Sequence, residues 1–411
     1  MGNQTYFDAL ETRTQEQREK EQFAKLAEQL AHAKANASFF GSLLKDIDPA
    51  SITDRAALAR IPVTRKSDLI DMQRDNPPFG GMLAAPLGRL FQSPGPIYDP
   101  EGHEEDYWST ARAFFAAGFR SGDVVLNTLS YHLTPGGFIL DAGARALGCG
   151  VIPAGPGNTE QQLEVIRDLR PSGYSGTPSF LRILMEKADE KGIDTSCFKK
   201  ALVTGEALPP SLRDWFTARG LVVGQAYATA DVGSIAYETS AREGLLVDEN
   251  SIVEIVRPGT DDPVAEGEVG EVVVTNLSSK TYPLIRFGTG DLSAVLAGES
   301  PCGRTNMRIK GWMGRADQRT KVKGMFVDPK QVDQVIKMFD EIQRGRLVVS
   351  SDDNRDAMTL QVEVDNGTDE LAKAISEQVQ NICKLRGAIE FVSLGSLAND
   401  GKVIDDIRTY E

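Results

Sequence analysis

A carboxylate directly follows a glycine-rich turn at the end of residues 282–291. The last four residues of this segment are Gly288, Thr289, Gly290 and Asp291. Glycines let the backbone approach a ligand closely, and one carboxylate can accept hydrogen bonds from two hydroxyl groups. The segment is therefore a candidate site for a ligand with neighbouring hydroxyls. A tight turn whose aspartate accepts bonds from local amides explains the same residues equally well.

Two further polar segments each follow an apolar run that is typical of a strand. The first holds Gly205 and Glu206, and the second holds Ala226, Tyr227, Ala228, Thr229 and Asp231. A tyrosine ring can stack on a base, and a carboxylate can hold magnesium. The alternative is a strand–helix loop with Glu206 near a helix start, a core tyrosine and a surface aspartate.

These segments belong to a region, residues 122–230, in which strands and helices alternate. Short apolar runs at 124–126, 151–152, 201–203 and 221–223 predict buried strands. Thr177 and Pro178 predict the start of a helix, and Gly192 its end. Such alternation predicts a mostly parallel sheet covered by helices, with ligands bound beyond the carboxyl ends of the strands.

The pattern changes twice towards the C-terminus. Valines and isoleucines separated by glycine and charge predict antiparallel β structure over residues 250–310. From residue 324 the order β-α-β-β-α-β predicts a small split βαβ domain. We therefore expect a large domain over residues 1–317 and a small, mobile domain over 318–411.

Length and composition limit the classes of function. A chain of 411 residues suits two domains, and 41% apolar with 25% charged residues is ordinary for a soluble protein. A net charge of −14 argues against nucleic acid and against an anionic membrane as partners. The four scattered cysteines predict reduced thiols, and the N-terminus has no signal-peptide pattern, so we expect a cytoplasmic protein.

Together the segments resemble the phenylacetate–coenzyme A ligase group of the adenylate-forming enzymes, over nearly the whole chain. The group's Pro-Leu-Ile-Arg-Tyr-x-Thr-Gly-Asp-Leu stands at residues 283–292, with Phe287 in place of tyrosine. Its Cys-Gly-Arg-Thr stands at 302–305, its Gly-Arg-Ala-Asp at 314–317, its Ile-Pro-Ala-Gly-x-Gly-Asn-Thr at 152–159 and its Gly-Thr-Pro-Ser at 176–179. The implied fold is α/β: a large domain of mostly parallel sheets covered by helices, a β subdomain, and a small βαββαβ domain.

The resemblance gives the matching residues roles in nucleotide binding. Asp291 would bind the ribose hydroxyls of AMP, and Tyr227 would pack on the adenine ring. The remaining nucleotide contacts that it implies are Gly205, Glu206, Ala226, Ala228, Thr229 and Arg315.

The resemblance also implies catalytic, hinge and substrate residues. Asp231 replaces the magnesium-binding glutamate of the group, and Lys402 matches the mobile lysine that stabilises charge during adenylate formation. Asp317 matches the hinge between the two domains. The acid substrate would lie against Tyr131, Thr134, Pro135 and Gly136, whose character suits an aromatic or medium-sized apolar acid.

The implied reaction has two halves and uses ATP, Mg²⁺ and coenzyme A. A small carboxylic acid attacks the α-phosphate of ATP to give an acyl-adenylate and pyrophosphate, and coenzyme A then displaces AMP. Magnesium and a lysine are needed because negative charge meets negative charge. Two alternatives stay open: an adenylating enzyme that transfers the acyl group to an amine or a carrier protein, and a nucleotide- or acyl-CoA-binding homologue with little ligase activity. A homodimer is also compatible with the resemblance.

The chain departs from the group in two places. The loop Ser-Ser-Gly-Thr-Thr-Gly-Lys, which holds the terminal phosphates of ATP, is replaced over residues 91–100 by a stretch with three prolines and Asp99. Prolines lack a donor N–H, so we expect weak binding of these phosphates. Ser300 stands where a zinc-binding Cys-Pro-Cys would begin, so we expect no zinc.

Overall fold

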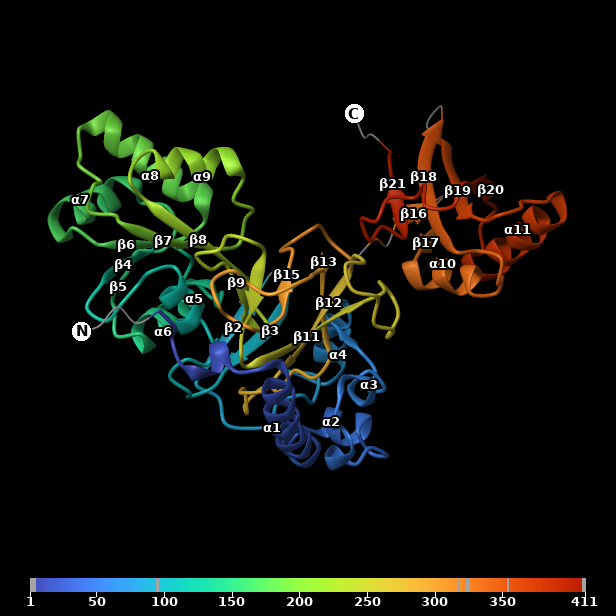
Figure 1. Cartoon of the computed structure of the whole chain (residues 1–411), viewed down its shortest axis with the longest axis horizontal. Coiled ribbons are helices and arrows are strands. Elements are labelled where there is room, and N and C mark those ends of the chain that lie inside the picture. The colour runs from blue at the N-terminus through green and yellow to red at the C-terminus, as the bar shows by residue number, and fades with distance from the viewer. Residues whose placement is uncertain are drawn as a thin grey trace. The chain divides into compact units, whose positions relative to one another are not determined.

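The computed structural model describes residues 5–93, 96–316, 318, 320–322, 325–352 and 355–408 (Figure 1). The backbone divides into two compact units. The first unit is made of Met1–Glu254, Val273–Thr289 and Val295–Trp312, and the second of Ile255–Val272, Gly290–Ala294 and Met313–Glu411. The predicted hinge residue, Asp317, lies outside the described residues.

The first unit begins with a 22-residue helix, α1, and several shorter helices, with one short strand among them and a hairpin after them. The helices are η1 Ala9–Thr12, α1 Gln15–Asn36, α2 Ser38–Leu43, η2 Pro49–Ser51, α3 Arg55–Leu58, η3 Lys66–Asp68 and α4 Leu69–Asp75. The strands are β1 Thr64–Arg65, and β2 Arg89–Ser93 with β3 Ile97–Glu101, which pair in antiparallel fashion.

A nine-stranded sheet with the order β14-β15-β10-β9-β8-β7-β6-β4-β5 forms the centre of the first unit. Its strands are β4 Val124–Asn127, β5 Gly150–Pro153, β6 Gly173–Gly176, β7 Lys200–Val203, β8 Val222–Thr229, β9 Gly233–Tyr237, β10 Leu245–Val247, β14 Val295–Leu296 and β15 Arg308–Ile309. Strands β5, β4, β6, β7 and β8 are parallel, and β9 returns antiparallel to β8. The predicted parallel sheet is therefore confirmed.

Helices cover both faces of this sheet. They are α5 Ala111–Ala116, α6 Gly136–Ala146, α7 Thr159–Leu169, α8 Pro178–Lys191 and α9 Pro210–Thr217. Figure 1 shows α7, α8 and α9 on one side of the strands and α5 and α6 on the other. Successive strand residues face opposite sides. Thus Leu126 packs with the core under α7–α9, whereas its neighbour Val125 packs with the core under α5 and α6.

The predicted limits of the helix after residue 177 are confirmed. The Thr177 hydroxyl accepts a hydrogen bond from the backbone N–H of Phe180, and Pro178 occupies the first helical position. Gly192 ends the helix with a φ of 65°, in the left-handed region that glycine adopts without a steric cost.

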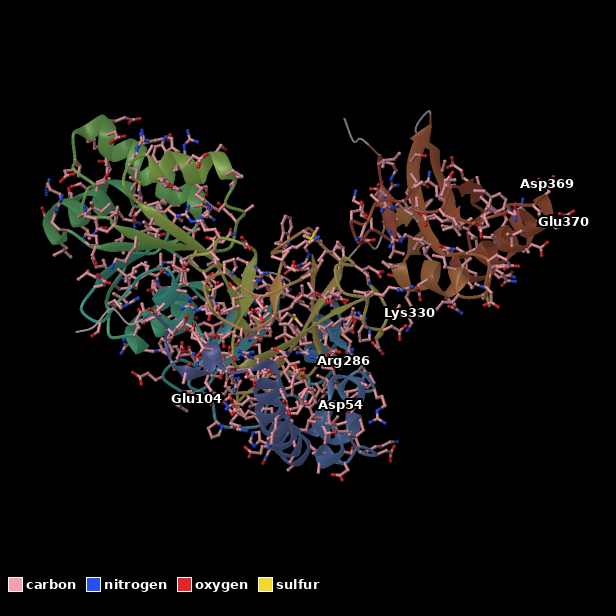
Figure 2. All side chains as sticks on the ribbon, in the orientation of Figure 1. Asp54, Glu104, Arg286, Lys330, Asp369 and Glu370 are labelled. Atoms are coloured by element: carbon pink, nitrogen blue, oxygen red, sulfur yellow. The ribbon has the colours of Figure 1, made fainter. Side chains whose placement is uncertain are left out.

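A second, four-stranded sheet has the order β1-β13-β12-β11, with β11 Ser251–Val256, β12 Gly270–Asn276 and β13 Phe287–Ser293. Arg286, the residue before β13, is fully buried. Figure 2 shows Arg286 within the body of the first unit. Its guanidinium donates to both carboxylate oxygens of Glu254, at 2.9 and 3.0 Å. It also donates to the carbonyls of Ala59 and Ile61, so it ties the N-terminal segment to this part of the unit.

The C-terminal part of the second unit has its own core. Its elements are β16 Thr320–Val322, β17 Met325–Val327, α10 Pro329–Ile336, β18 Arg344–Asp352, β19 Arg355–Glu363, α11 Asp369–Cys383, β20 Ala388–Val392 and β21 Ile404–Asp406. The helices α10 and α11 pack together against the sheet β20-β19-β18-β21. Asp369 and Glu370 occupy the first turn of α11, where the helix dipole favours acidic side chains, and Figure 2 shows them at the outer end of that helix.

The element order β-α-β-β-α-β predicted from residue 324 onward is present, but the strand pairing differs in one detail. Strand β17 pairs with β16 in a separate hairpin, and β21 pairs in parallel with β18 at the edge of the sheet. A run of three apolar residues predicts a strand without specifying its partner. None of the helices in the described part of the chain combines the length and the hydropathy needed to cross a membrane.

Arg286→Met is expected to destabilise the first unit strongly. The substitution leaves the Glu254 carboxylate buried without its cation, and removing one partner of a buried ion pair costs about 3–5 kcal/mol. Urea unfolding measures the change. Arg74→Met is the control, because Arg74 pairs with Asp71 at the surface and such a pair contributes less than about 1 kcal/mol. Equal losses in the two variants would contradict a structural role for the buried pair.

Candidate functional site

The first predicted segment lies at the carboxyl edge of the parallel strands. Strand β7 ends at Val203, and Gly205 turns the chain with a φ of 80°. A carboxylate oxygen of Glu206 lies 3.4 Å from the backbone N–H of Ser179, in the first turn of α8. Gly205 and Glu206 therefore lie where parallel α/β sheets bind ligands.

Strand β8 brings the second segment to the same edge, since Val203 pairs with Gln225. The buried Tyr227 hydroxyl donates to the Thr289 hydroxyl at 3.1 Å, which joins two motifs 62 residues apart in the sequence. Thr289 is followed along β13 by Gly290 and Asp291. The pairing of β8 with β9 is irregular between Tyr227 and Ala228, and Thr229 accepts a bond from the N–H of Val232.

Asp231, in the turn between β8 and β9, is bound by a lysine that sequence reasoning missed. The Lys66 ammonium contacts one carboxylate oxygen at 2.6 Å, and the aspartate side chain is fully buried. Its second oxygen, Oδ1, has no hydrogen-bond partner among the described residues. Lys66 follows β1, which pairs with Phe287 and Gly288 of β13 and so brings the lysine to this motif.

A second buried carboxylate, Asp99, lies near Asp231. Asp99 is 1% exposed, and neither of its carboxylate oxygens has a hydrogen-bond partner in the described part of the chain. Burial, followed by the negative charge of Asp231, raises the pKa of Asp99 to about 7, although Ser93 and Lys66 act in the opposite direction. Two buried carboxylates thus share one ammonium group.

The segment that replaces the phosphate loop is a regular β-hairpin. Its two strands pair without interruption from Arg89 opposite Glu101 to Ser93 opposite Ile97. Of the ten residues 91–100, Pro94 and Gly95 lie outside the described residues. Backbone N–H groups that serve a strand ladder cannot also converge on a phosphate. The Arg89 guanidinium is also bound within the hairpin, since it donates to both carboxylate oxygens of Glu101 at 3.0 and 3.1 Å.

The predicted acid-binding segment precedes and begins helix α6. The Tyr131 hydroxyl accepts from the Asn127 amide at 2.7 Å and lies 3.3 Å from Asp141. The Tyr131 ring meets the edge of Phe138, with ring centroids 5.0 Å apart. A side chain at Gly137 would come within 2.8 Å of the Tyr131 ring. Thr134 accepts from the N–H of Gly136, and Pro135 occupies the N-cap of α6.

In the second unit, Asp291 and Arg315 form an ion pair. The guanidinium contacts the carboxylate at 2.7 Å, and the two backbones form an isolated β-bridge. Gly290 has a φ of 75°, and a Cβ at this position would lie 2.6 Å from the Arg315 guanidinium. Glycine is therefore required between Thr289 and Asp291 for the arginine to approach this closely.

Lys402 lies in the same unit, half-exposed, with its ammonium 2.7 Å from Asp405. A cavity of about 380 Å³ is lined by Arg315, Lys402 and Asp405, together with Leu292, the residue after Asp291. The structure therefore brings three of the predicted residues, Asp291, Arg315 and Lys402, to one region of the second unit.

The remaining predicted residues are grouped in the first unit, on the elements described above. Lys66 has no signal in its local sequence, because its partner is 165 residues away. The burial of Asp99 could have been inferred from its place in β3, two residues from the buried Ile97 and therefore on the same face. The four cysteines are free, and the described residues contain no group of three His, Cys, Asp or Glu side chains that could hold a metal.

The fold and these motifs define the class of protein. Residues 103–278 match the family model of AMP-binding enzymes, and residues 324–406 match the model of the AMP-binding enzyme C-terminal domain. The chain is 31% identical to phenylacetate-coenzyme A ligase of Thermus thermophilus, covering 87% of this chain and 84% of the relative. It is 30% identical to the Pseudomonas putida enzyme of the same name, covering 96% and 95%.

The chain therefore belongs to the phenylacetate-coenzyme A ligase family of AMP-binding enzymes. Among solved structures, it is similar to 2-hydroxyisobutyryl-CoA ligase in an open conformation, in complex with 2-HIB-AMP and CoA. That comparison has a TM-score of 0.73 and 25% sequence identity, and it covers 97% of this chain and 93% of the other.

Asp99→Asn is expected to change the pH dependence of stability. Because the folded chain keeps a proton on Asp99 up to about pH 7, its stability falls as the pH rises from 4 to 7. A rise in pKa of this size corresponds to at most about 4 kcal/mol. In urea unfolding, the asparagine variant should match the wild type at pH 4 and exceed its stability at pH 8. Asp46→Asn, at an exposed position, is the control. If Asp99→Asn changed the free energy of unfolding equally at both pH values, the raised pKa of Asp99 would be contradicted.

Proposed function

We propose that this protein joins a carboxylic acid to coenzyme A through an acyl-adenylate formed from ATP. The observation that carries the proposal is the agreement with phenylacetate-coenzyme A ligases over most of both chains. The likeness to a solved ligase in complex with 2-HIB-AMP and CoA supports the same reaction partners. The arrangement of Gly205, Glu206 and Tyr227 at the carboxyl edge of a parallel sheet agrees with a nucleotide site.

The nucleotide roles follow the motifs. Tyr227 packs on the adenine ring, and its bond to Thr289 supports this role because it holds the ring in place. Asp291 accepts hydrogen bonds from the ribose hydroxyls, and Arg315 orients the Asp291 carboxylate. Gly205 and Glu206 lie along the base, as do Ala226, Ala228 and Thr229.

The acid lies against Tyr131, Thr134, Pro135 and Gly136. The tyrosine ring is held by Phe138 and its hydroxyl by Asn127, so the segment offers a fixed aromatic surface. Such a surface suits an aromatic acid, or an apolar acid of medium size. The relatives named for phenylacetate agree with this class.

Adenylation requires positive charge near the phosphates. Asp231 would hold Mg²⁺, and its buried, unpartnered oxygen next to Asp99 fits a divalent cation, which prefers carboxylate oxygens. A magnesium ion bound there would neutralise phosphate charge. Lys402 supplies a second cation for adenylate formation, and the small domain then rotates at Asp317 before coenzyme A displaces AMP.

The hairpin at residues 89–101 lowers the affinity for the terminal phosphates of ATP. The described residues of its two strands pair with each other in a ladder, and β3 places the Asp99 carboxylate near Asp231. AMP and an acyl-adenylate lack these phosphates, so the hairpin does not lower their affinity. This observation also favours a second candidate function, a nucleotide- or acyl-CoA-binding homologue with weak ligase activity.

The function is tested by thioester formation with a panel of acids. With ATP, Mg²⁺ and coenzyme A, phenylacetate and similar acids should give acyl-CoA and pyrophosphate, and Lys402→Ala should slow adenylation but spare thioester formation from a supplied acyl-adenylate. Acyl transfer to an amine without coenzyme A would support the amide-ligase alternative. If no acid gave a product, the result would support the alternative function, a nucleotide- or acyl-CoA-binding homologue.

Calorimetry with AMP and ATP tests the nucleotide site separately from catalysis. AMP should bind more tightly than ATP, and Asp291→Ala should weaken AMP binding by about tenfold to a hundredfold, as expected for a charge-assisted hydrogen bond. Replacing residues 93–100 with a loop of Gly, Ser, Thr and Lys should improve ATP binding and leave AMP binding unchanged. Equal affinities for ATP and AMP in the wild type would contradict the effect of the hairpin, and unchanged AMP binding in the alanine variant would contradict the role of Asp291.

A further inference from the structure

A second cavity of the second unit has a chemistry that the proposed reaction does not use. It has a volume of about 190 Å³, and its walls come from four segments of the chain, one of which is α10 with Asp333. Arg257 and Glu268 come from the segment between β11 and β12, and Arg344 from the start of β18. Lys402 comes from the loop before β21.

The walls of this cavity are held in place by the chain itself. Asn399 accepts a bond from the N–H of Val269 and donates to the carbonyl of Gly267. Gly401 has a φ of 72°, and a Cβ there would lie 2.8 Å from Val269. The loop before β21 thus lies directly against the segment between β11 and β12 in this structure.

The lining is positively charged. It contains the cations Arg257, Arg344 and Lys402 and two carboxylates, those of Glu268 and Asp333, which gives a net charge of +1. Asp333 is already paired with Lys337 at 2.9 Å, and Lys402 with Asp405 at 2.7 Å, and both of these partners lie outside the lining. The charges that remain are the two guanidinium groups and the Glu268 carboxylate. The field inside the cavity therefore favours an anion over a cation.

The two guanidinium groups have unused donors. The contacts of Arg344 with the described residues include one weak bond, from Nη1 to the carbonyl of Leu397 at 3.5 Å. Arg257 lies 4.0 Å from Asp333, which is the limit of an ion pair. Each guanidinium carries five N–H donors in a planar fork, so most donors of both groups stay available to a ligand.

We propose that this cavity binds a phosphate monoester, through the guanidinium groups of Arg257 and Arg344. Planar guanidinium forks match the oxygens of a phosphate and bind them in pairs, and a dianion gains more from a cationic cavity than a carboxylate does. On the function proposed above, the source of this group is the 3′-phosphate of coenzyme A. Free inorganic phosphate offers the same chemistry.

The test compares coenzyme A with dephospho-coenzyme A, which lacks only the 3′-phosphate. Calorimetry should show tighter binding of coenzyme A to the wild-type protein. Arg257→Gln and Arg344→Gln should each weaken coenzyme A binding by roughly tenfold, the lower range for a charge-assisted hydrogen bond at a partly exposed site. Binding of dephospho-coenzyme A should stay unchanged. In the thioester assay, the KM for coenzyme A should rise in the same variants, with the KM values for ATP and the acid unaffected.

Lys330→Ala is the matched control. Lys330, labelled in Figure 2, is an exposed cation in the first turn of α10 and does not line the cavity. If this variant weakened coenzyme A binding as much as the arginine variants, a general effect of net charge would replace the specific site. Far-ultraviolet circular dichroism checks that all variants are folded, and Arg257→Lys, which keeps the charge but not the fork, should recover part of the affinity.

The outcomes separate this site from the proposed ligase activity. Tight binding of inorganic phosphate that depends on both arginines, without discrimination between the two coenzymes, would support the phosphate site and exclude coenzyme A as its source. Equal binding of the two coenzymes, with no effect of either arginine on phosphate binding, would overturn the proposal even in an active ligase. Because calorimetry measures binding without turnover, it tests the phosphate site even if no acid gives a thioester.

Discussion

The charge balance around Asp231 constrains how the first unit is assembled. Two carboxylates, Asp231 and Asp99, are buried close together with one ammonium group, that of Lys66. A buried charge without a partner is costly, so the folded chain keeps a proton on Asp99 near neutral pH, or a cation must enter. The three residues come from η3, β3 and the β8–β9 turn. The cluster therefore forms only when these elements have met.

The hairpin that carries Asp99 differs in form from the phosphate-binding loop that the resemblance predicts at this place. A phosphate-binding loop is open and rich in glycine, so that its N–H groups can point at a ligand. Here the same stretch pairs with itself from Arg89 to Glu101, and the N–H groups of the ladder have partners. The same pairing places the buried Asp99 carboxylate near Asp231. The contacts of Tyr227 with Thr289 and of Asp291 with Arg315 do not involve this stretch.

The second unit arranges its cations around two cavities that share Lys402. In one, Lys402 lies with Arg315, which holds Asp291. In the other, it lies with Arg257 and Arg344. Gly290 and Gly401 both have positive φ, and a side chain at Gly290 would meet Arg315 while one at Gly401 would meet Val269. The same short loop, residues 398–403, thus links the lysine proposed for adenylation to the cationic cavity.

The sequence by itself determined the α/β class, the limits of helix α8 and the family. These features rest on local patterns: buried strands of four residues, a threonine N-cap, a glycine C-cap, and motifs in a fixed order. It also predicted that Gly205, Glu206 and Tyr227 lie at one edge of a sheet, because parallel strands end together. The tertiary structure alone decided that Lys66 binds Asp231, that β21 replaces β17 in the sheet, and that Arg315 pairs with Asp291. Burial and ion pairing depend on distances between segments far apart in the chain, and no local pattern of side chains encodes those distances.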